Sequence, residues 1–150
     1  MSGFLFRLEA SLRISEQALE AAQREFAQEM QLWKSFVEAS KVQQEHFNEA
    51  QEGQREAGRH SAEELGIWHL FVAEQQRQLH QCNVALREQE PILEQARRVL
   101  LEAHREVEKF ERLKEKQSKA FQLAELQKEQ KVLDETGQVL HWRQQSVHTK

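Results

Sequence analysis

Residues that interrupt helices or form cross-links are scarce in this sequence of 150 residues, which has one proline, five glycines and one cysteine. Tyrosine is absent. The single cysteine, Cys82, excludes an internal disulfide framework and suits a reducing compartment. The glycines stand apart from one another, so the glycine loop that cradles phosphates in nucleotide-binding enzymes is absent. No stretch approaches the roughly 20 apolar residues of a membrane span, and the N-terminus lacks the apolar run of a signal peptide. We therefore expect a soluble, cytoplasmic protein without direct membrane insertion.

Groups of side chains that carry out chemistry are also missing. No two of the seven histidines lie four residues apart on one helix face, so the sequence does not support a metal site. Carboxylates are abundant, but exposed helices offer them no pocket that would tune them for catalysis. The basic residues between Lys109 and Lys119 are interleaved with Glu111 and Glu115, which is typical of ion pairs along a helix. We expect no enzymatic activity, no cofactor and no nucleic-acid partner.

What the sequence does contain is a seven-residue repeat of mostly large apolar side chains. A second seven-residue repeat runs three residues after the first. No segment keeps the two-residue alternation of a strand for long. Such sustained repeats are typical of helices that pair in coiled coils. The first half of the repeat contains Leu5, Leu12, Leu19, Phe26, Trp33, Ser40 and Phe47, and the second half contains Val72, Leu79, Leu86, Leu93, Leu100 and Val107.

The stretch Gly58-Arg59-His60-Ser61 separates the two halves of the repeat. Gly58 is suited to the left-handed conformation that ends many helices, although Gly53 could end the first helix earlier. Ser61 and Glu64 have the spacing of a capping box, in which each side chain binds a free backbone N–H of the next helix. The chain is therefore predicted to turn at residues 58–61.

A turn there brings together residues that are equidistant from a midpoint near position 59. The apolar repeats then pair with each other, as in Leu12 with Val107. The polar residues inside the repeats also pair, as in Glu29 with Gln89 and Gln43 with Gln75, and such pairs usually fix the register. The predicted fold is all-α, a long antiparallel two-helix coiled-coil hairpin whose C-terminal helix outruns the N-terminal one.

The expected boundaries describe a single coiled-coil domain over residues 1–150. The first helix covers about 4–57, the turn 58–61 and the second helix about 62–136, followed by a flexible tail at 137–150. Pro91 lies inside the second helix and is expected to kink it, because proline removes one backbone hydrogen bond. The register places Leu5 opposite Lys114, so the second helix from about residue 115 has no partner within the chain.

Three apolar surfaces remain without a partner in this hairpin. The second helix beyond about residue 115 needs another subunit to cover its apolar side chains, or else a tail folded back after Gly137. Near the turn, the apolar residues outnumber the positions of one seam, so they form either a wider core with Phe47 or a docking patch. Phe4 and Phe6 flank Leu5 and cannot both face the second helix, so they form either a frayed end or a binding surface.

The sequence resembles the FliJ family, the small coiled-coil proteins of the bacterial flagellar type III export apparatus. The resemblance lies in the opening stretch Phe4–Arg13, the central stretch Trp68–Phe71 and the closing stretches Phe110–Lys116 and Lys128–Glu135. It covers nearly the whole chain through its length, its architecture and scattered positions. Pro91 departs from the family pattern, as does Trp68, where a tyrosine is expected.

The resemblance implies a non-enzymatic part of the export apparatus. Family members act as a central stalk of the hexameric export ATPase, and they contact the large membrane protein of the export gate and the export chaperones. On this basis the protein is peripheral at the cytoplasmic face of the inner membrane. The ATPase-ring contact is expected at Phe4, Phe6, Arg7, Phe121, Leu123, Leu126, Val132 and Leu133, and the export-gate contact at Trp68, Phe71, Val72 and Gln75.

Two other functions remain open at this stage. One is the equivalent stalk of a virulence type III secretion system, which this sequence does not distinguish from a flagellar one. The other is a generic cytoplasmic coiled-coil spacer or homodimer, since coiled coils of unrelated function share the same repeats.

Overall fold

The computed structural model describes residues 3–148, except for the side chain of His148, and it contains two α-helices. Helix α1 covers Glu9–Gly58 and helix α2 covers Ala62–His148. The two helices contact each other, and α2 has 87 residues against 50 in α1. The prediction of an all-α hairpin with a longer C-terminal helix is therefore confirmed.

The chain divides into two compact units, each of which contains parts of both helices. The turn unit comprises residues 17–104, and the end unit comprises the described residues of 1–16 and 105–150. The sequence predicted one coiled-coil domain, but a seam of only two helices has local contacts along its length and no common core.

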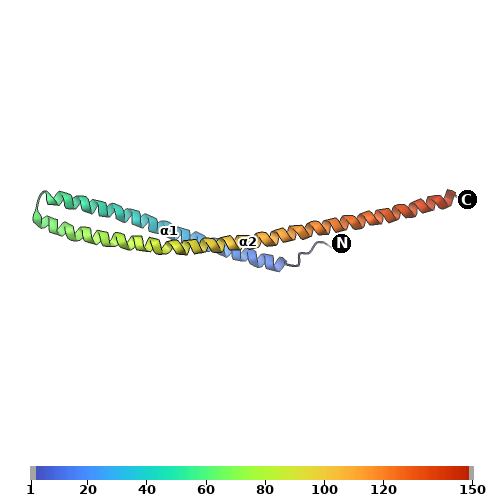
Figure 1. Cartoon of the computed structure of the whole chain (residues 1–150), viewed down its shortest axis with the longest axis horizontal. Helices are drawn as coiled ribbons and strands as arrows, with labels where there is room; N and C mark the ends of the chain where they lie inside the picture. Colours follow the sequence, from blue (N-terminus) through green and yellow to red (C-terminus); the bar gives the residue numbers. More distant parts are fainter. Residues whose placement is uncertain (1–2, 149–150) are drawn as a thin grey trace. The chain divides into compact units, whose positions relative to one another are not determined.

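In the turn unit, α1 and α2 lie side by side and run in opposite directions (Figure 1). The amide of Gln89 donates hydrogen bonds to the backbone carbonyl of Glu29 at 3.3 Å and to its carboxylate. The amide of Gln43 donates to Oε1 of Gln75 at 2.8 Å. Both polar pairs that the sequence predicted across the seam are present, which confirms the predicted register of this unit.

The turn forms where it was predicted, but its local chemistry differs. No residue in the described part of the chain has a positive φ, so Gly58 does not take the left-handed conformation. Instead, Arg59 and His60 donate their N–H groups to the carbonyls of Glu56 and Ala57, and these short bonds satisfy the end of α1. Only half of the capping box is present: the Ser61 hydroxyl accepts from the N–H of Glu64 at 3.5 Å. The N–H of Ser61 is already bound to the carbonyl of Ala57.

Helix α2 runs through Pro91 without interruption. The residue is exposed, so the carbonyl that loses its backbone donor lies near solvent and water can satisfy it. A bend of the helix at this proline stays a prediction.

Helix α2 also continues past Gly137 to His148, where the sequence predicted a flexible tail. That prediction was wrong over 137–148, and residues 149–150 lie outside the described part. A single glycine costs a helix only about 1 kcal/mol relative to alanine, and no proline follows it. Every residue from 126 to 147 is exposed, so residues 137–147 do not fold back over residues 126–136.

Helix α1 begins at Glu9 instead of near residue 4, and the segment before it packs differently from the prediction. Leu5, which the repeat placed in the seam, is 91% exposed, whereas Phe6 is 8% exposed. Lys114 pairs with the carboxylate of Glu9 at 2.9 Å and not with Leu5. Burial that alternates from residue to residue is characteristic of extended backbone, and it lets Phe4 and Phe6 face one side together.

Candidate partner-binding surfaces

Residues 3–8, which precede α1 without helical structure, form a short N-terminal strap in the end unit. The ring of Phe4 packs on that of Phe121 of α2, with centroids 5.8 Å apart and ring planes inclined by 46°. The strap turns into the helix at Arg7 and Leu8, where the N–H of Glu9 donates to the carbonyl of Phe6 at 3.2 Å. Two of the residues expected to contact a partner, Phe4 and Phe121, are thus in contact with each other.

The strap borders a shallow groove of about 500 Å³ in the end unit. Apolar and charged side chains line it together, because the seam ends here and α2 continues without α1. The groove is lined by Phe4, Leu12, Glu16, Glu111, Lys114, Glu115, Ser118, Lys119 and Gln122.

Residues 122–148 of α2, which we call the overhang, follow the last ring contact with the strap. Its large apolar side chains are exposed, and four of them recur every seven residues as Leu126, Leu133, Leu140 and Val147. A seven-residue spacing on one helix places these side chains along one face. The remaining exposed apolar residues of the overhang are Leu123, Val132, Val139 and Trp142.

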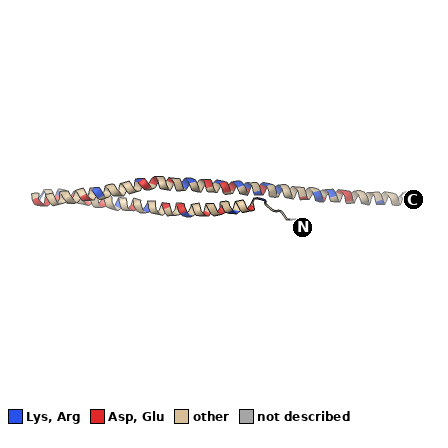
Figure 2. Ribbon diagram, turned by 90° about the horizontal axis from the view of Figure 1, so that it is seen from below, with Lys and Arg blue, Asp and Glu red and all other residues tan. Residues whose placement is uncertain are grey.

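The overhang carries few charges near its C-terminal end. Figure 2 shows Lys and Arg interspersed with Asp and Glu along both helices, and the last part of α2 is mostly uncharged. Its polar contacts are local, as in the ion pair of Lys128 with Glu125 at 3.8 Å and the hydrogen bond from Gln130 to Asp134 at 3.2 Å. Exposed pairs of this kind contribute little to stability, so they do not compete strongly with a partner.

A second surface lies close to the turn. The rings of Trp68 and Phe71 meet edge to face with centroids 5.6 Å apart. They line a groove of about 340 Å³ together with His46, Glu49, Ala50 and Gln75. Ile67 and Leu70 are exposed on the same helix, so apolar surface extends beyond the groove. Val72 is half-buried, as expected of a seam residue.

Trp68 also packs closely against α1. A Cβ atom added to Gly53 would meet three atoms of the indole ring at 3.0 Å or less. The sequence offered Gly53 as an earlier end of the first helix, but the helix continues through it to Gly58. Its structural role is to leave room for the indole.

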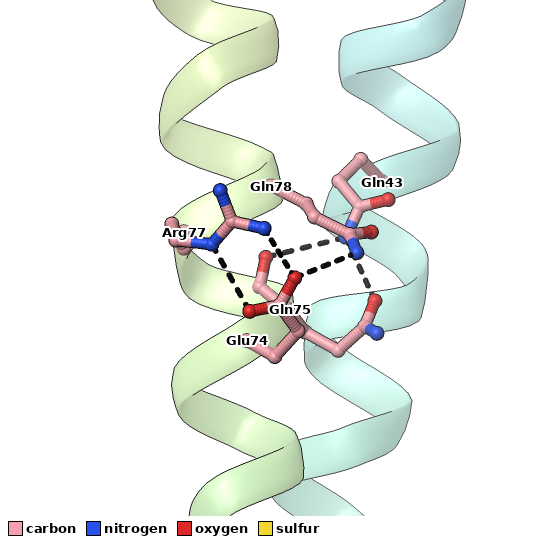
Figure 3. Close-up of polar contacts among 5 residues, drawn as sticks. All are labelled: Gln43, Glu74, Gln75, Arg77 and Gln78. Carbon is pink, nitrogen blue, oxygen red and sulfur yellow. Dashed lines mark hydrogen bonds and ion pairs between the residues drawn. The ribbon is translucent and has the colours of Figure 1, made fainter.

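A polar network lies directly beside this groove (Figure 3). Gln75 accepts from Gln43 with both its side-chain and its backbone oxygen, so its side chain already has a partner within the chain. The Arg77 guanidinium donates to the carboxylate of Glu74, at 3.0 Å from Nε, and the Gln78 amide donates to it at 3.2 Å. These two donors, Arg77 first, lower the pKa of Glu74 to about 2.

The expected ring-contact residues therefore fall into two groups. The exposed group lies on the overhang and consists of Leu123, Leu126, Val132 and Leu133, while Phe4, Phe6 and Phe121 pack within the chain. Arg7 is exposed at the turn between the strap and α1. Leu140 and Val147 were not expected to contact the ring, because residues 137–150 were predicted to form a flexible tail. The seven-residue spacing from Leu126 was the signal that could have included them.

Among the described residues, no group of three or more His, Cys, Asp or Glu side chains is arranged to hold a metal ion. Within residues 3–148, neither helix includes a segment apolar enough to span a bilayer.

Comparisons with known proteins identify the family of the chain. Comparison with curated proteins and with solved structures gave no significant match. The family model described as the flagellar FliJ protein matches residues 4–146, which is nearly the whole chain. This confirms the resemblance noted in the sequence, and the protein belongs to the FliJ family.

Proposed function

We propose that this protein, whose family indicates a role in flagellar protein export, is a non-enzymatic stalk that docks in the ring of the export ATPase. The overhang enters the ring, and the surface around Trp68 and Phe71 contacts the large membrane protein of the export gate. Export chaperones bind the same protein. It then works at the cytoplasmic face of the membrane that holds the gate.

The observation that carries the proposal is the exposed apolar track of the overhang. Burial of a leucine or valine side chain stabilises an interface by about 1.5–3 kcal/mol, so several such residues on one face provide enough for specific binding. At 1.5 Å per residue the overhang is on the order of 40 Å long, which suits insertion of a single helix into a protein channel. Its mixed, local charges do not oppose contact with an apolar lining.

The second contact of the proposal rests on the groove near the turn. Aromatic side chains that are only partly buried are frequent at the centres of protein interfaces. Phe71 is exposed and Trp68 is half-buried, and exposed Ile67 and Leu70 extend the apolar surface. Gln75, which is bound to Gln43, contributes at the rim through its remaining amide donor.

The test is ATP hydrolysis by the cognate flagellar export ATPase, measured with and without the full-length protein. We expect stimulation by the native chain and a loss of at least tenfold in apparent affinity when Leu126 and Leu133 are both replaced by Asp, since two buried contacts become unpaired charges. The matched control carries Gln127→Asp and Gln138→Asp, which add the same charge on another face of the helix. Equal loss in both variants would contradict docking through the leucine track.

The same assay separates the stalk from a spacer. A spacer does not change the ATPase rate and does not bind the ATPase, so absence of both effects for the native chain would support that alternative. Replacement of Phe71 by Asp is expected to leave ATPase stimulation unchanged and to weaken binding to the gate protein, because the two surfaces lie in different units. Loss of both activities in this variant would contradict the separate assignment.

A further inference from the structure

The N-terminal strap has a sequence that satisfies two different periodicities. In the structure, Phe4 packs on Phe121 of α2, Phe6 is buried and Leu5 is exposed, an alternation that is typical of extended backbone. The same Leu5 lies seven residues before Leu12, which is 4% exposed in the seam. If α1 were longer by a turn, the repeat would therefore place Leu5 in the seam and remove the two phenylalanines from α2.

The strap packs on α2 at Phe121, directly before the start of the overhang. Phe121 is half-buried, and its ring contact is with Phe4. After Glu125 every residue up to 147 is exposed. Phe121 is thus a seam position of α2 that α1 does not reach as a helix and that the strap covers instead.

The packing around the strap is incomplete. The groove of about 500 Å³ beside it is lined by Leu12 and Lys114, the residues between which a helical Leu5 would lie. The ion pair of Glu9 with Lys114 fixes the first turn of α1 at this point. Extension of α1 by one turn would exchange the Phe4–Phe121 contact and the burial of Phe6 for the burial of Leu5 and a helical turn.

We propose that residues 4–8 are a latch with two states, which covers Phe121 as a strap and exposes it by extending α1 by one turn. This inference rests on the proposed function, because the partner that takes over Phe121 is the one that docks on the overhang. The latch makes docking and the helical extension of α1 a single coupled step. A partner helix that packs on Phe121 shifts the chain to the released state, in which Leu5 fills the groove.

Disulfide trapping in the full-length chain tests the strap state directly. In a Cys82→Ser background, the pair Phe4→Cys and Phe121→Cys is expected to cross-link at least tenfold faster than the pair Leu5→Cys and Phe121→Cys. Excess cognate export ATPase should slow the first reaction at least about threefold, because a partner docked at position 121 displaces the strap from it. If the ATPase binds and the reaction rate is unchanged, the latch is refuted while the proposed function stands.

Binding measurements test the released state. Replacing Phe4 and Phe6 by Ala opens the latch and is expected to tighten ATPase binding roughly threefold to tenfold. Leu5→Asp should weaken binding by a similar factor, although Leu5 is 91% exposed and has no role in the strap. A third variant, Leu5→Gly, tests backbone flexibility. If Leu5→Gly weakens ATPase binding and Leu5→Asp does not, the flexibility of the backbone and not the burial of Leu5 controls binding, and the proposal is overturned.

If the ATPase does not bind at all, the proposed function is wrong, but the two states of the latch can still be tested. A measurement without a partner serves for this. Amide hydrogen exchange is followed at Ala10 and Ser11 in the full chain, because their N–H groups gain the carbonyls of Phe6 and Arg7 as partners when α1 is one turn longer. With Phe4 and Phe6 replaced by Asp, these amides should become protected by about fivefold or more as the turn becomes helical. Adding Leu5→Asp to that variant should abolish the protection, and protection that persists would overturn the two-state latch.

Discussion

Helix α2 has two stretches with similar apolar repeats, of which one is packed and the other is exposed. Between residues 62 and 104 its apolar repeat faces α1, and the side chains at the repeat positions are buried or half-buried. Between 126 and 147 leucines recur with the same spacing, but all of them are exposed. A seven-residue repeat therefore specifies that a helix needs a neighbour, and it does not specify whether that neighbour belongs to the same chain.

The largest expected effect separates a paired leucine from an unpaired one. Leu12→Ala removes a side chain that is 4% exposed, and we expect a loss of about 2–4 kcal/mol in the free energy of unfolding. Leu126→Ala on the overhang should change it by less than about 0.5 kcal/mol, since this side chain has no covering neighbour. Urea denaturation followed by circular dichroism measures both, and equal losses would show that the overhang is packed in solution.

The polar layers of the turn unit give the next effect. Gln89→Leu removes the donor to the Glu29 carboxylate and buries a leucine beside it, which should cost about 1–3 kcal/mol. Replacing Glu29 by Leu as well leaves no unpaired group and should recover most of that stability. A double-mutant cycle by thermal unfolding tests this, and an additive result would mean that the two side chains do not interact.

Glycines provide a comparison in which the sign of the effect is expected to change. Gly53→Ala places a methyl group against the Trp68 ring and should destabilise the turn unit by about 1–3 kcal/mol, despite the better helix propensity of alanine. In a Trp68→Ala background the same substitution should stabilise by about 1 kcal/mol. Gly137→Ala, which meets nothing within 4 Å, is the control and should also stabilise its helix. Melting temperatures of the four variants decide the question.

The smallest effect concerns the half-buried Glu74 and its carboxylate. Because Arg77 and Gln78 lower its pKa from 4.5 to about 2, the group stabilises the helix above pH 4.5 and loses that contribution as the pH falls towards 2. NMR titration of the side-chain carboxyl carbon should show this low value. Arg77→Gln should return the pKa towards 4.5, and a titration that does not move would mean that the pair does not form in solution.

Much of the fold followed from the sequence because a coiled coil is specified by spacing. The register could be predicted from Gln43 with Gln75 and Glu29 with Gln89, since polar residues at seam positions have few alternatives to each other. The packing of the N-terminus could not be predicted, because Leu5 fitted the repeat, whereas the structure exposes Leu5, buries Phe6 and packs Phe4 on Phe121. The end of α2 was misjudged because one glycine was given the weight of a helix stop.

The candidate surfaces were predicted less completely than the fold. Exposed apolar residues on the overhang followed from the different lengths of the helices, and the aromatic cluster at Trp68 and Phe71 followed from its density. The covered state of Phe121 did not, because it depends on where six residues of non-helical chain lie. Sequence spacing describes helices well and describes such segments poorly.

The continuity of α2 has a consequence for the kinetics of docking. An isolated helix in water must first form a costly nucleus, whereas a helix that continues from a paired stretch needs only propagation. The seam thus acts as a permanent nucleus from which the overhang extends residue by residue, with fraying concentrated at the C-terminal end. A partner that meets the overhang encounters a helix already formed, so the encounter does not wait for a folding step and most of the ordering entropy is lost before contact.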